Sequence, residues 1–164
     1  VFNLGVSGDV TDALLKRIEV ELEARTDGES LIIFDIGGND AVRNLITNEC
    51  QVPLDRFKDN YRHMIALAKA KGRVACLGIH DSDESRLNPI PYYKDHAALD
   101  TDGEEYDQAI KELAQQYDCI YISMKGILSG DFKSLTYDGD HPTAEGHRLI
   151  FERVKFELER VGVL

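Results

Sequence analysis

The sequence predicts an α/β domain in which a mainly parallel sheet is covered by helices on both faces. Apolar, β-branched runs of strand length alternate along the chain with longer segments whose apolar residues recur at helical spacing. The strand-like runs are mostly apolar, which is typical of strands buried on both faces. Strands that alternate with helices form βαβ units and hence a parallel sheet. We therefore expect a three-layer α/β/α architecture, with residues 1–164 in a single domain.

The strands are expected where the apolar runs occur. Residues 31–36 and 74–79 predict buried strands, and 120–123 predicts the last one. Residues 1–8 predict a short strand followed by a glycine loop. Ligands bind at the carboxyl ends of the strands in such sheets, so the residues that follow each strand are candidates for a site.

The helices are expected where apolar stripes follow the helical period. These segments are approximately 9–25, 53–71, 104–117 and 143–161. A turn at 26–29 ends the first helix, and 41–46 is compatible with a further short one. His63 and His147 lie on helical segments and are expected near the surface.

Long segments without either pattern are expected to be loops at 81–101 and 124–136. A loop of about 20 residues is unusual in a compact domain and is often a lid or a binding loop. The first of these loops contains Tyr92 and Tyr93, whose rings we expect to line an acyl or alcohol pocket.

The composition is typical of a soluble globular protein, with 43% hydrophobic and 30% charged residues. The net charge of −11 argues against nucleic acid or an anionic membrane as a partner, because phosphate contacts need clustered Lys and Arg. No apolar run reaches the length of a membrane span. Cys50, Cys76 and Cys119 lack metal-ligand spacing and are expected to be free thiols, which favours a reducing, cytoplasmic location. A homo-oligomer is compatible with this composition.

The segment 137–147 carries the most informative polar pattern. Asp138 and His141 are three residues apart in a turn closed by Pro142, so their side chains can form a hydrogen bond. A carboxylate in this position fixes the tautomer of the imidazole and stabilises the ring once it is protonated. One interpretation is a histidine general base oriented by Asp138. The other is a helix-capping turn whose polar groups are solvated.

Polar residues also follow the two buried strands: Gly38, Asn39 and Asp40 follow the first, and His80 follows the second. The side-chain amide of Asn39 can donate to a developing oxyanion. The alternative is a polar turn that has no function. His80 would lie near the same pocket, either in contact with a substrate or hydrogen-bonded within its own loop.

Taken together, these segments resemble the conserved blocks of the GDSL-type esterases and lipases, also called SGNH hydrolases. The segment 37–40 is similar to the third block of that family and 138–142 to its last block. The segment 3–11 is similar to the second block. Each motif is weak alone, but they occur in the order and with the spacing of the family.

The resemblance implies a fold and a set of roles. The fold is a flavodoxin-like parallel sheet. Asp138 and His141 would belong to the catalytic triad, while the Asn39 amide and the Gly8 N–H would stabilise the oxyanion. The residues that we expect to contact substrate are Gly38, His80 and Asp40. No metal ion or cofactor is required.

The first block of the family, which carries the nucleophilic serine after the first strand, has no match in this sequence. We expect a strand and a helix of about 30 to 50 residues to lie upstream and to occupy the centre of the sheet. Their absence would leave a slot between residues 1–8 and 31–36. A separate chain that carries this unit and a pseudoenzyme are the alternatives. Ser7 is the internal serine nearest to the expected site, but no serine lies in a strand-to-helix elbow beside His141.

The function that these patterns favour is hydrolysis of a small or sugar-linked ester through an acyl-enzyme. The polar, tyrosine-bearing loop favours such an ester over a long lipid. A metal-dependent hydrolase using Asp138, Asp140, His141 and His80 is one alternative. A non-catalytic module that binds an acyl group or a carbohydrate in the same cleft is the other.

Overall fold

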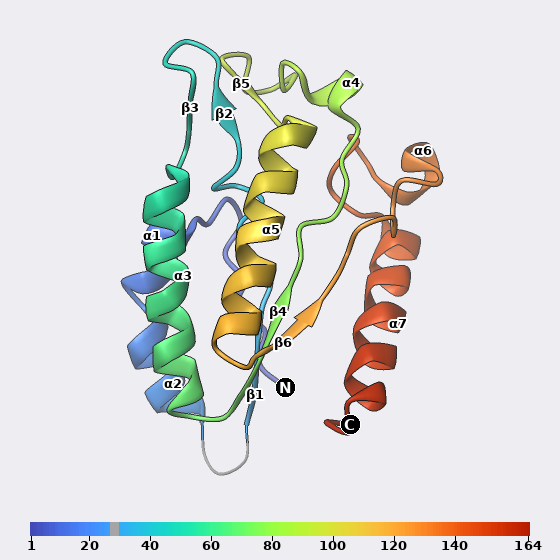
Figure 1. The fold of residues 1–164 in the computed structure, drawn as a ribbon. Helices are drawn as coiled ribbons and strands as arrows, with labels where there is room; N and C mark the ends of the chain where they lie inside the picture. Colours follow the sequence, from blue (N-terminus) through green and yellow to red (C-terminus); the bar gives the residue numbers. More distant parts are fainter. Residues whose placement is uncertain (27–29) are drawn as a thin grey trace.

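The computed structural model describes residues 1–26 and 30–164. Its main sheet has parallel strands in the order β1-β4-β6, which are β1 (Leu31–Phe34), β4 (Arg73–Leu77) and β6 (Ile120–Ile122) (Figure 1). The predicted buried strands are therefore confirmed, although each ends earlier than expected. The predicted α/β architecture is also confirmed.

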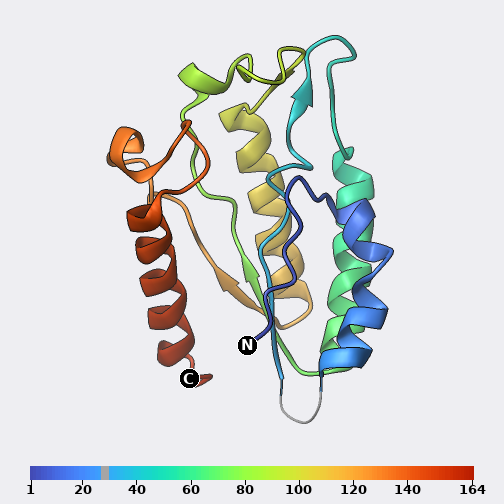
Figure 2. The ribbon, with the colours of Figure 1, turned by 180° about the vertical axis from the view of Figure 1, so that it is seen from behind.

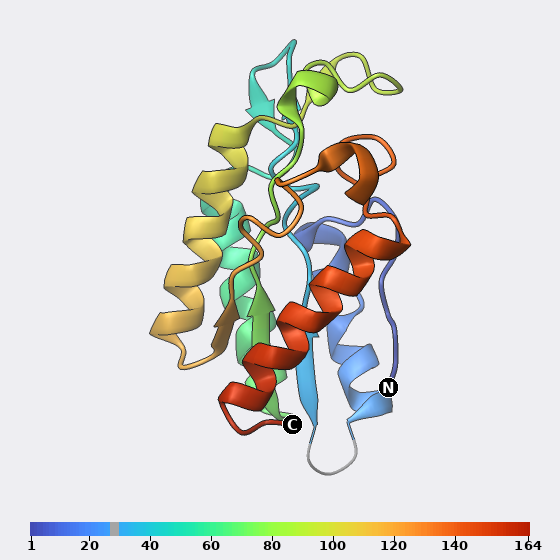
Figure 3. The ribbon, with the colours of Figure 1, turned by 90° about the vertical axis from the view of Figure 1, so that its right-hand side faces the viewer.

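Helices cover both faces of this sheet. One face carries α3 (Leu54–Lys69) and α5 (Asp100–Gln116), with α1 (Thr11–Leu15) and α2 (Ile18–Arg25) packed beside α3. The opposite face is crossed by α7 (Ala144–Arg160), and Figure 3 shows α5 and α7 on opposite sides of the strands.

The continuous apolar run of β4 follows from this arrangement. Val74 and Cys76 belong to the core on the α3 and α5 side, whereas Ala75 and Leu77 pack with Leu158 of α7. Successive side chains of a strand point to opposite faces, so a strand covered on both faces is apolar at every position. Burial of each large apolar side chain in these cores stabilises the fold by roughly 1.5–3 kcal/mol.

A second, antiparallel sheet lies beyond the carboxyl ends of the main strands. It has the order β3-β2-β5, formed by β2 (Arg43–Asn44), β3 (Glu49–Cys50) and β5 (His96–Ala97). The interpretation of residues 41–46 as a short helix is therefore wrong, because this segment contains β2. Asn44 closes a hairpin here, because its side-chain oxygen accepts hydrogen bonds from the backbone N–H groups of Ile46 and Thr47.

The predicted loops contain short elements. The segment 81–101 includes α4 (Glu84–Leu87) as well as β5, and 124–136 includes α6 (Phe132–Leu135). Asp131 caps α6, since its side chain accepts a hydrogen bond from the N–H of Ser134. Elements of four residues or fewer carry too little periodicity to be predicted from sequence.

The helix boundaries differ from expectation at two places. The predicted helix at 9–25 is divided into α1 and α2 at Arg17, whose side chain pairs with Asp9 at 2.5 Å and donates to the carbonyl of Leu4. The helix expected from residue 104 begins at Asp100. Most of the turn expected at 26–29 lies outside the described residues.

The strand predicted at residues 1–8 is absent. The segment is irregular and exposed, and Figure 2 shows it leading into α1. β1 is an edge strand of the main sheet, so one side of its backbone has no strand partner among the described residues. A groove of about 1990 Å³ runs between the N-terminal segment, β1 and α7, with Leu31, Ile33 and Val154 among its apolar lining residues. This groove lies where the slot was expected, but residues 1–8 do not form the strand that was expected to border it.

Among the described residues, no helix combines the length and the apolar character needed to cross a membrane.

Candidate active site

The side chains of Asp138 and His141 form the predicted hydrogen bond. Nδ1 of His141 lies 2.8 Å from Oδ2 of Asp138. The other carboxylate oxygen accepts from the backbone N–H groups of Asp140, at 3.1 Å, and His141, at 2.9 Å. Asp138 therefore holds both its own turn and the imidazole ring. The turn needs Gly139, which has a φ of +108° and lies against Asp83, where a Cβ atom would be 3.1 Å from the Asp83 Cβ.

This contact determines which nitrogen of His141 is available. A carboxylate only accepts hydrogen bonds, so Nδ1 carries the proton and Nε2 is the basic atom of the neutral ring. The hydrogen bond with Asp138 raises the pKa of His141 above its usual value, although partial burial opposes this effect. Desolvation would raise the pKa of Asp138, but the hydrogen bonds from His141 and Asp140 outweigh it and lower that pKa.

The segment 37–39 lines the groove as well. Gly37 has a φ of +130°, and a Cβ atom there would lie 3.3 Å from the ring of Phe57. Gly38 and Asn39 line the groove. Nδ2 of Asn39 donates a hydrogen bond to the carbonyl oxygen of Asp9 at 3.0 Å, and its second N–H remains available for another acceptor.

That hydrogen bond brings the predicted second block beside Asn39. Gly8 precedes Asp9 and is exposed, with a φ of +75°. Asp9, Asn39 and His141 all line the same groove, but Gly8 itself does not. The structure therefore brings Asn39 and the His141 pair to one groove and leaves Gly8 at its border.

Asp40 does not face the groove, so the expectation of a substrate contact is wrong for this residue. Its side chain has no exposed surface. The carboxylate accepts hydrogen bonds from the backbone N–H and the hydroxyl of Thr11, and Asn60 donates in turn to that hydroxyl. Burial raises the pKa of Asp40, and the hydrogen bonds from Thr11 oppose that effect. Asp40 fixes the loop to α1.

His80 lies at the carboxyl edge of the sheet, after β4, and lines the groove. Its Nδ1 is 3.1 Å from the carbonyl oxygen of Asp81 and 3.9 Å from Oδ1 of Asp140. Asp35 lies in the same groove, where desolvation raises the pKa of its carboxyl group and the nearby His80 and His147 oppose the effect.

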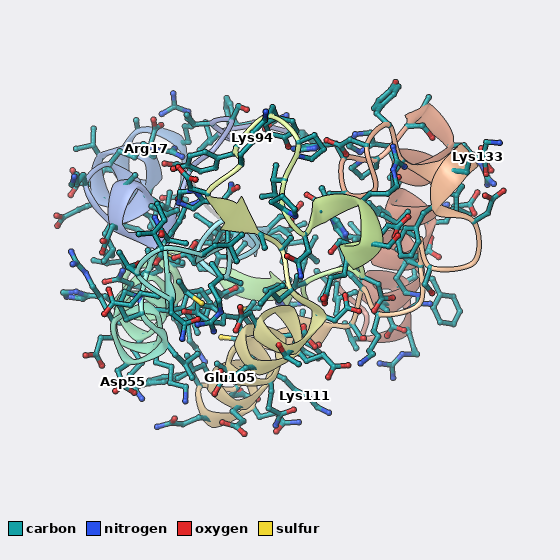
Figure 4. The ribbon with its side chains drawn as sticks, turned by 90° about the horizontal axis from the view of Figure 1, so that it is seen from above. Arg17, Asp55, Lys94, Glu105, Lys111 and Lys133 are labelled. Atoms are coloured by element: carbon teal, nitrogen blue, oxygen red, sulfur yellow. The ribbon has the colours of Figure 1, made fainter. Side chains whose placement is uncertain are left out.

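Tyr92 and Tyr93 do not line the groove, which contradicts the expectation for the long loop. Tyr93 stacks on His96 with ring centroids 3.6 Å apart. The hydroxyl of Tyr92 reaches Oδ2 of Asp138 at 3.5 Å. Figure 4 looks down on this end of the molecule, with Lys94 marking the loop before β5 and Lys133 marking α6. Nothing in the sequence indicated that Tyr92 would approach the histidine pair.

No serine in the described part of the chain takes the position of a nucleophile. No hydroxyl group there lies within hydrogen-bond distance of Nε2 of His141. Ser7 is exposed and does not line the groove. Within the same described residues, no group of three or more His, Cys, Asp or Glu side chains is arranged to hold a metal ion.

The comparisons with known proteins agree with this architecture. Residues 1–149 match the model of the GDSL-like lipase/acylhydrolase family. A lipase/acylhydrolase from Enterococcus faecalis has a similar structure, with a TM-score of 0.72 and 22% identity over 92% of this chain and 71% of the other. No match was found among curated proteins.

Two further solved structures are similar. A GDSL-like lipase from Bacteroides thetaiotaomicron has a TM-score of 0.74 and 20% identity over 96% of this chain and 74% of the other. An acetylxylan esterase from Geobacillus stearothermophilus, crystallised as a catalytic mutant, has a TM-score of 0.70 and 18% identity over 96% of this chain and 71% of the other. At these sequence identities, the solved structures show only that the fold is shared. The match of residues 1–149 to the family model is a similarity in sequence. The chain therefore belongs to the GDSL-like lipase/acylhydrolase family, and it is a carboxylic ester hydrolase.

Proposed function

We propose that this chain supplies the base and the oxyanion-binding groups of a serine-type hydrolase that cleaves small or sugar-linked esters through an acyl-enzyme. The observation that carries the proposal is the 2.8 Å contact between His141 and Asp138, at a groove that Asn39 also lines. A histidine held by a carboxylate, in a groove that an amide donor also lines, matches the requirements of acyl transfer.

Each group has a role in that reaction. Nε2 of His141 takes the proton of the serine hydroxyl as the serine oxygen bonds to the ester carbonyl carbon. The protonated ring then gives this proton to the alkoxide that leaves, and the acyl-enzyme remains. Water, deprotonated by the same nitrogen, releases the acid and restores the serine. Asp138 stabilises the imidazolium, and the Asn39 amide donates to the oxyanion, together with the N–H of Gly8.

We assign the nucleophilic serine to a strand outside residues 1–164 that pairs with the free edge of β1. It belongs either to an upstream segment or to a separate chain. Two observations support this assignment: β1 is an edge strand, and Ile33 on its α7 side is 41% exposed. A parallel strand in this position would end at the same edge as Asn39 and His80, where a residue after it could reach His141.

The test is labelling of the natural protein that contains this chain with a fluorophosphonate, followed by mass spectrometry of the labelled peptide. We expect one labelled serine, located outside residues 1–164, and loss of labelling in His141→Ala. Labelling of Ser7 would contradict the assigned nucleophile. Absence of any labelling in the folded protein would instead indicate the non-catalytic binding module.

A further inference from the structure

The two carboxylates of the 138–141 turn face different histidines. Asp138 binds Nδ1 of His141 at 2.8 Å, whereas Oδ1 of Asp140 lies 3.9 Å from Nδ1 of His80. The side chain of His80 is 25% exposed, and that of Asp140 is 39% exposed. His80 and Asp140 line the same groove as His141. A second imidazole therefore lines the groove of the proposed base, and the mechanism above does not use it.

The surroundings of His80 determine which of its ring nitrogens is free. A carbonyl oxygen only accepts hydrogen bonds, so the contact with Asp81 O at 3.1 Å places the proton on Nδ1. Nε2 of the neutral ring then has a lone pair. No described residue forms a hydrogen bond with Nε2. The ring thus offers an acceptor, not a donor, at its free nitrogen.

The segment that carries His80 is held on both sides. Oδ2 of Asp81 accepts from the N–H of Gly126 at 2.5 Å, and Oδ1 of Asp107 accepts from the N–H of Ile79 at 2.9 Å. A Cβ atom at Gly78 would lie 2.4 Å from the Asp107 side chain, so this close packing against Asp107 requires glycine. Groups that are fixed by their own hydrogen bonds in this way are suited to recognition.

This side of the groove is rich in acceptors. Asp35, Asp140 and His80 line the groove, as does Lys125, which is paired with Glu104, and a carboxylate has no donor when ionised. A neutral group with several hydroxyl donors can satisfy these acceptors. Simple acyl groups such as acetyl have no hydroxyl, so these donors would belong to the alcohol part of the ester.

We propose that His80 is a specificity residue whose Nε2 accepts a hydrogen bond from a hydroxyl group on the alcohol part of the substrate. The site then selects esters of polyhydroxylated alcohols, such as partly acylated sugars or glycerol, over esters of simple alcohols with the same acyl group. This inference rests on the proposed function and adds the class of alcohol to it.

The experiment compares two acetate esters with the natural protein: an acetylated methyl glycoside that retains free hydroxyls and an alkyl acetate. The quantity measured is the ratio of their kcat/KM values. His80→Phe keeps a planar ring and removes the acceptor, and we expect the ratio to fall about fivefold to tenfold, mainly through the KM of the glycoside ester. His80→Gln places an amide oxygen near the position of Nε2 and should restore most of the ratio.

His63→Phe is the matched control, because His63 is exposed on α3 and does not line the groove. It should leave the ratio unchanged. An equal loss for both esters in folded His80→Phe and His80→Gln, or no change in either variant, would overturn the inference. If the natural protein hydrolyses neither ester and is not labelled by the fluorophosphonate, the proposed function fails and this inference fails with it.

Discussion

The carboxylate of Asp40 accepts hydrogen bonds from the backbone N–H and the hydroxyl of Thr11, a residue 29 positions earlier in the chain. Both side chains are fully buried. Asn39 directly precedes Asp40, and its amide contacts the carbonyl of Asp9, two residues before Thr11. The pair therefore fixes the segment that carries the proposed oxyanion donor against the start of α1.

Thr11→Val should destabilise the fold. Valine has the same shape as threonine, but it leaves the buried carboxylate of Asp40 without its hydroxyl donor, and the Asn60 amide retains only its hydrogen bond to Asp12. We expect the free energy of unfolding to fall by about 1–3 kcal/mol, measured by urea denaturation. Thr11→Ser retains the hydroxyl and should keep most of the stability. A difference between the two variants of less than about 0.5 kcal/mol would contradict the role of the hydroxyl.

Gly37→Ala should also destabilise the segment that carries Asn39. Gly37 has a φ of +130°, where a Cβ atom is strained, and that atom would also meet the ring of Phe57. We expect a loss of at least about 1 kcal/mol in the free energy of unfolding. Gly38→Ala is the control, because a Cβ atom there meets nothing within 4 Å. Equal stability of the two variants would show that the loop adapts.

Asn39→Ala should lower kcat about 100- to 1000-fold and change KM little, since an oxyanion donor acts mainly in the transition state. Steady-state kinetics of the natural protein measure both constants. The thermal midpoint of the variant should be measured in parallel, because the substitution also removes the hydrogen bond to Asp9. A rise in KM without loss of kcat would assign Asn39 to substrate binding.

The features that could be predicted from the sequence are those that depend on local periodicity or on residues close together in the chain. β4 was recognised because both of its faces are buried, which leaves a continuous apolar run. The contact between Asp138 and His141 was predictable because three residues in a turn bring the two side chains together. The pairs Thr11–Asp40 and His80–Asp140 form only when distant segments of the chain pack together, so no local sequence pattern predicts them.

Residues 1–8 show the limit of strand propensity. They have the apolar pattern of a strand, but a strand also needs a neighbour to accept its backbone hydrogen bonds. None is present beside them in the described residues, and the segment is irregular. The reverse occurs at β2, where Arg43 and Asn44 lack a strand pattern and are ordered by pairing with β3 and with His96 and Ala97 of β5.

The activity of the natural protein should rise with pH through a midpoint above 6.5. The base must be neutral to accept a proton, and the hydrogen bond to Asp138 raises the pKa of His141 above its ordinary value of 6.5. Measurement of kcat/KM between pH 5 and pH 9 gives the midpoint. Asp138→Asn should lower both the midpoint and the rate. A midpoint at or below 6.5 would be inconsistent with the His141–Asp138 pair as the base.

Ile33→Lys tests whether a strand and a helix cover the free side of β1. Ile33 is 41% exposed in the described structure, so within these residues alone a lysine there would reach solvent. If further polypeptide covers β1 in the natural protein, the ammonium group is buried without a partner, and we expect a loss of more than about 2 kcal/mol in the free energy of unfolding. Fluorophosphonate labelling should fall as well, because the nucleophile would be displaced.

Val20→Lys is the matched control for this substitution. Val20 lies on α2 and is 69% exposed, so the same change from a branched apolar residue to lysine should alter the stability by less than about 0.5 kcal/mol. Similar stability of the two variants, with labelling intact in both, would mean that nothing covers β1 at Ile33. The nucleophile would then have to reach His141 from a direction other than the free edge of β1.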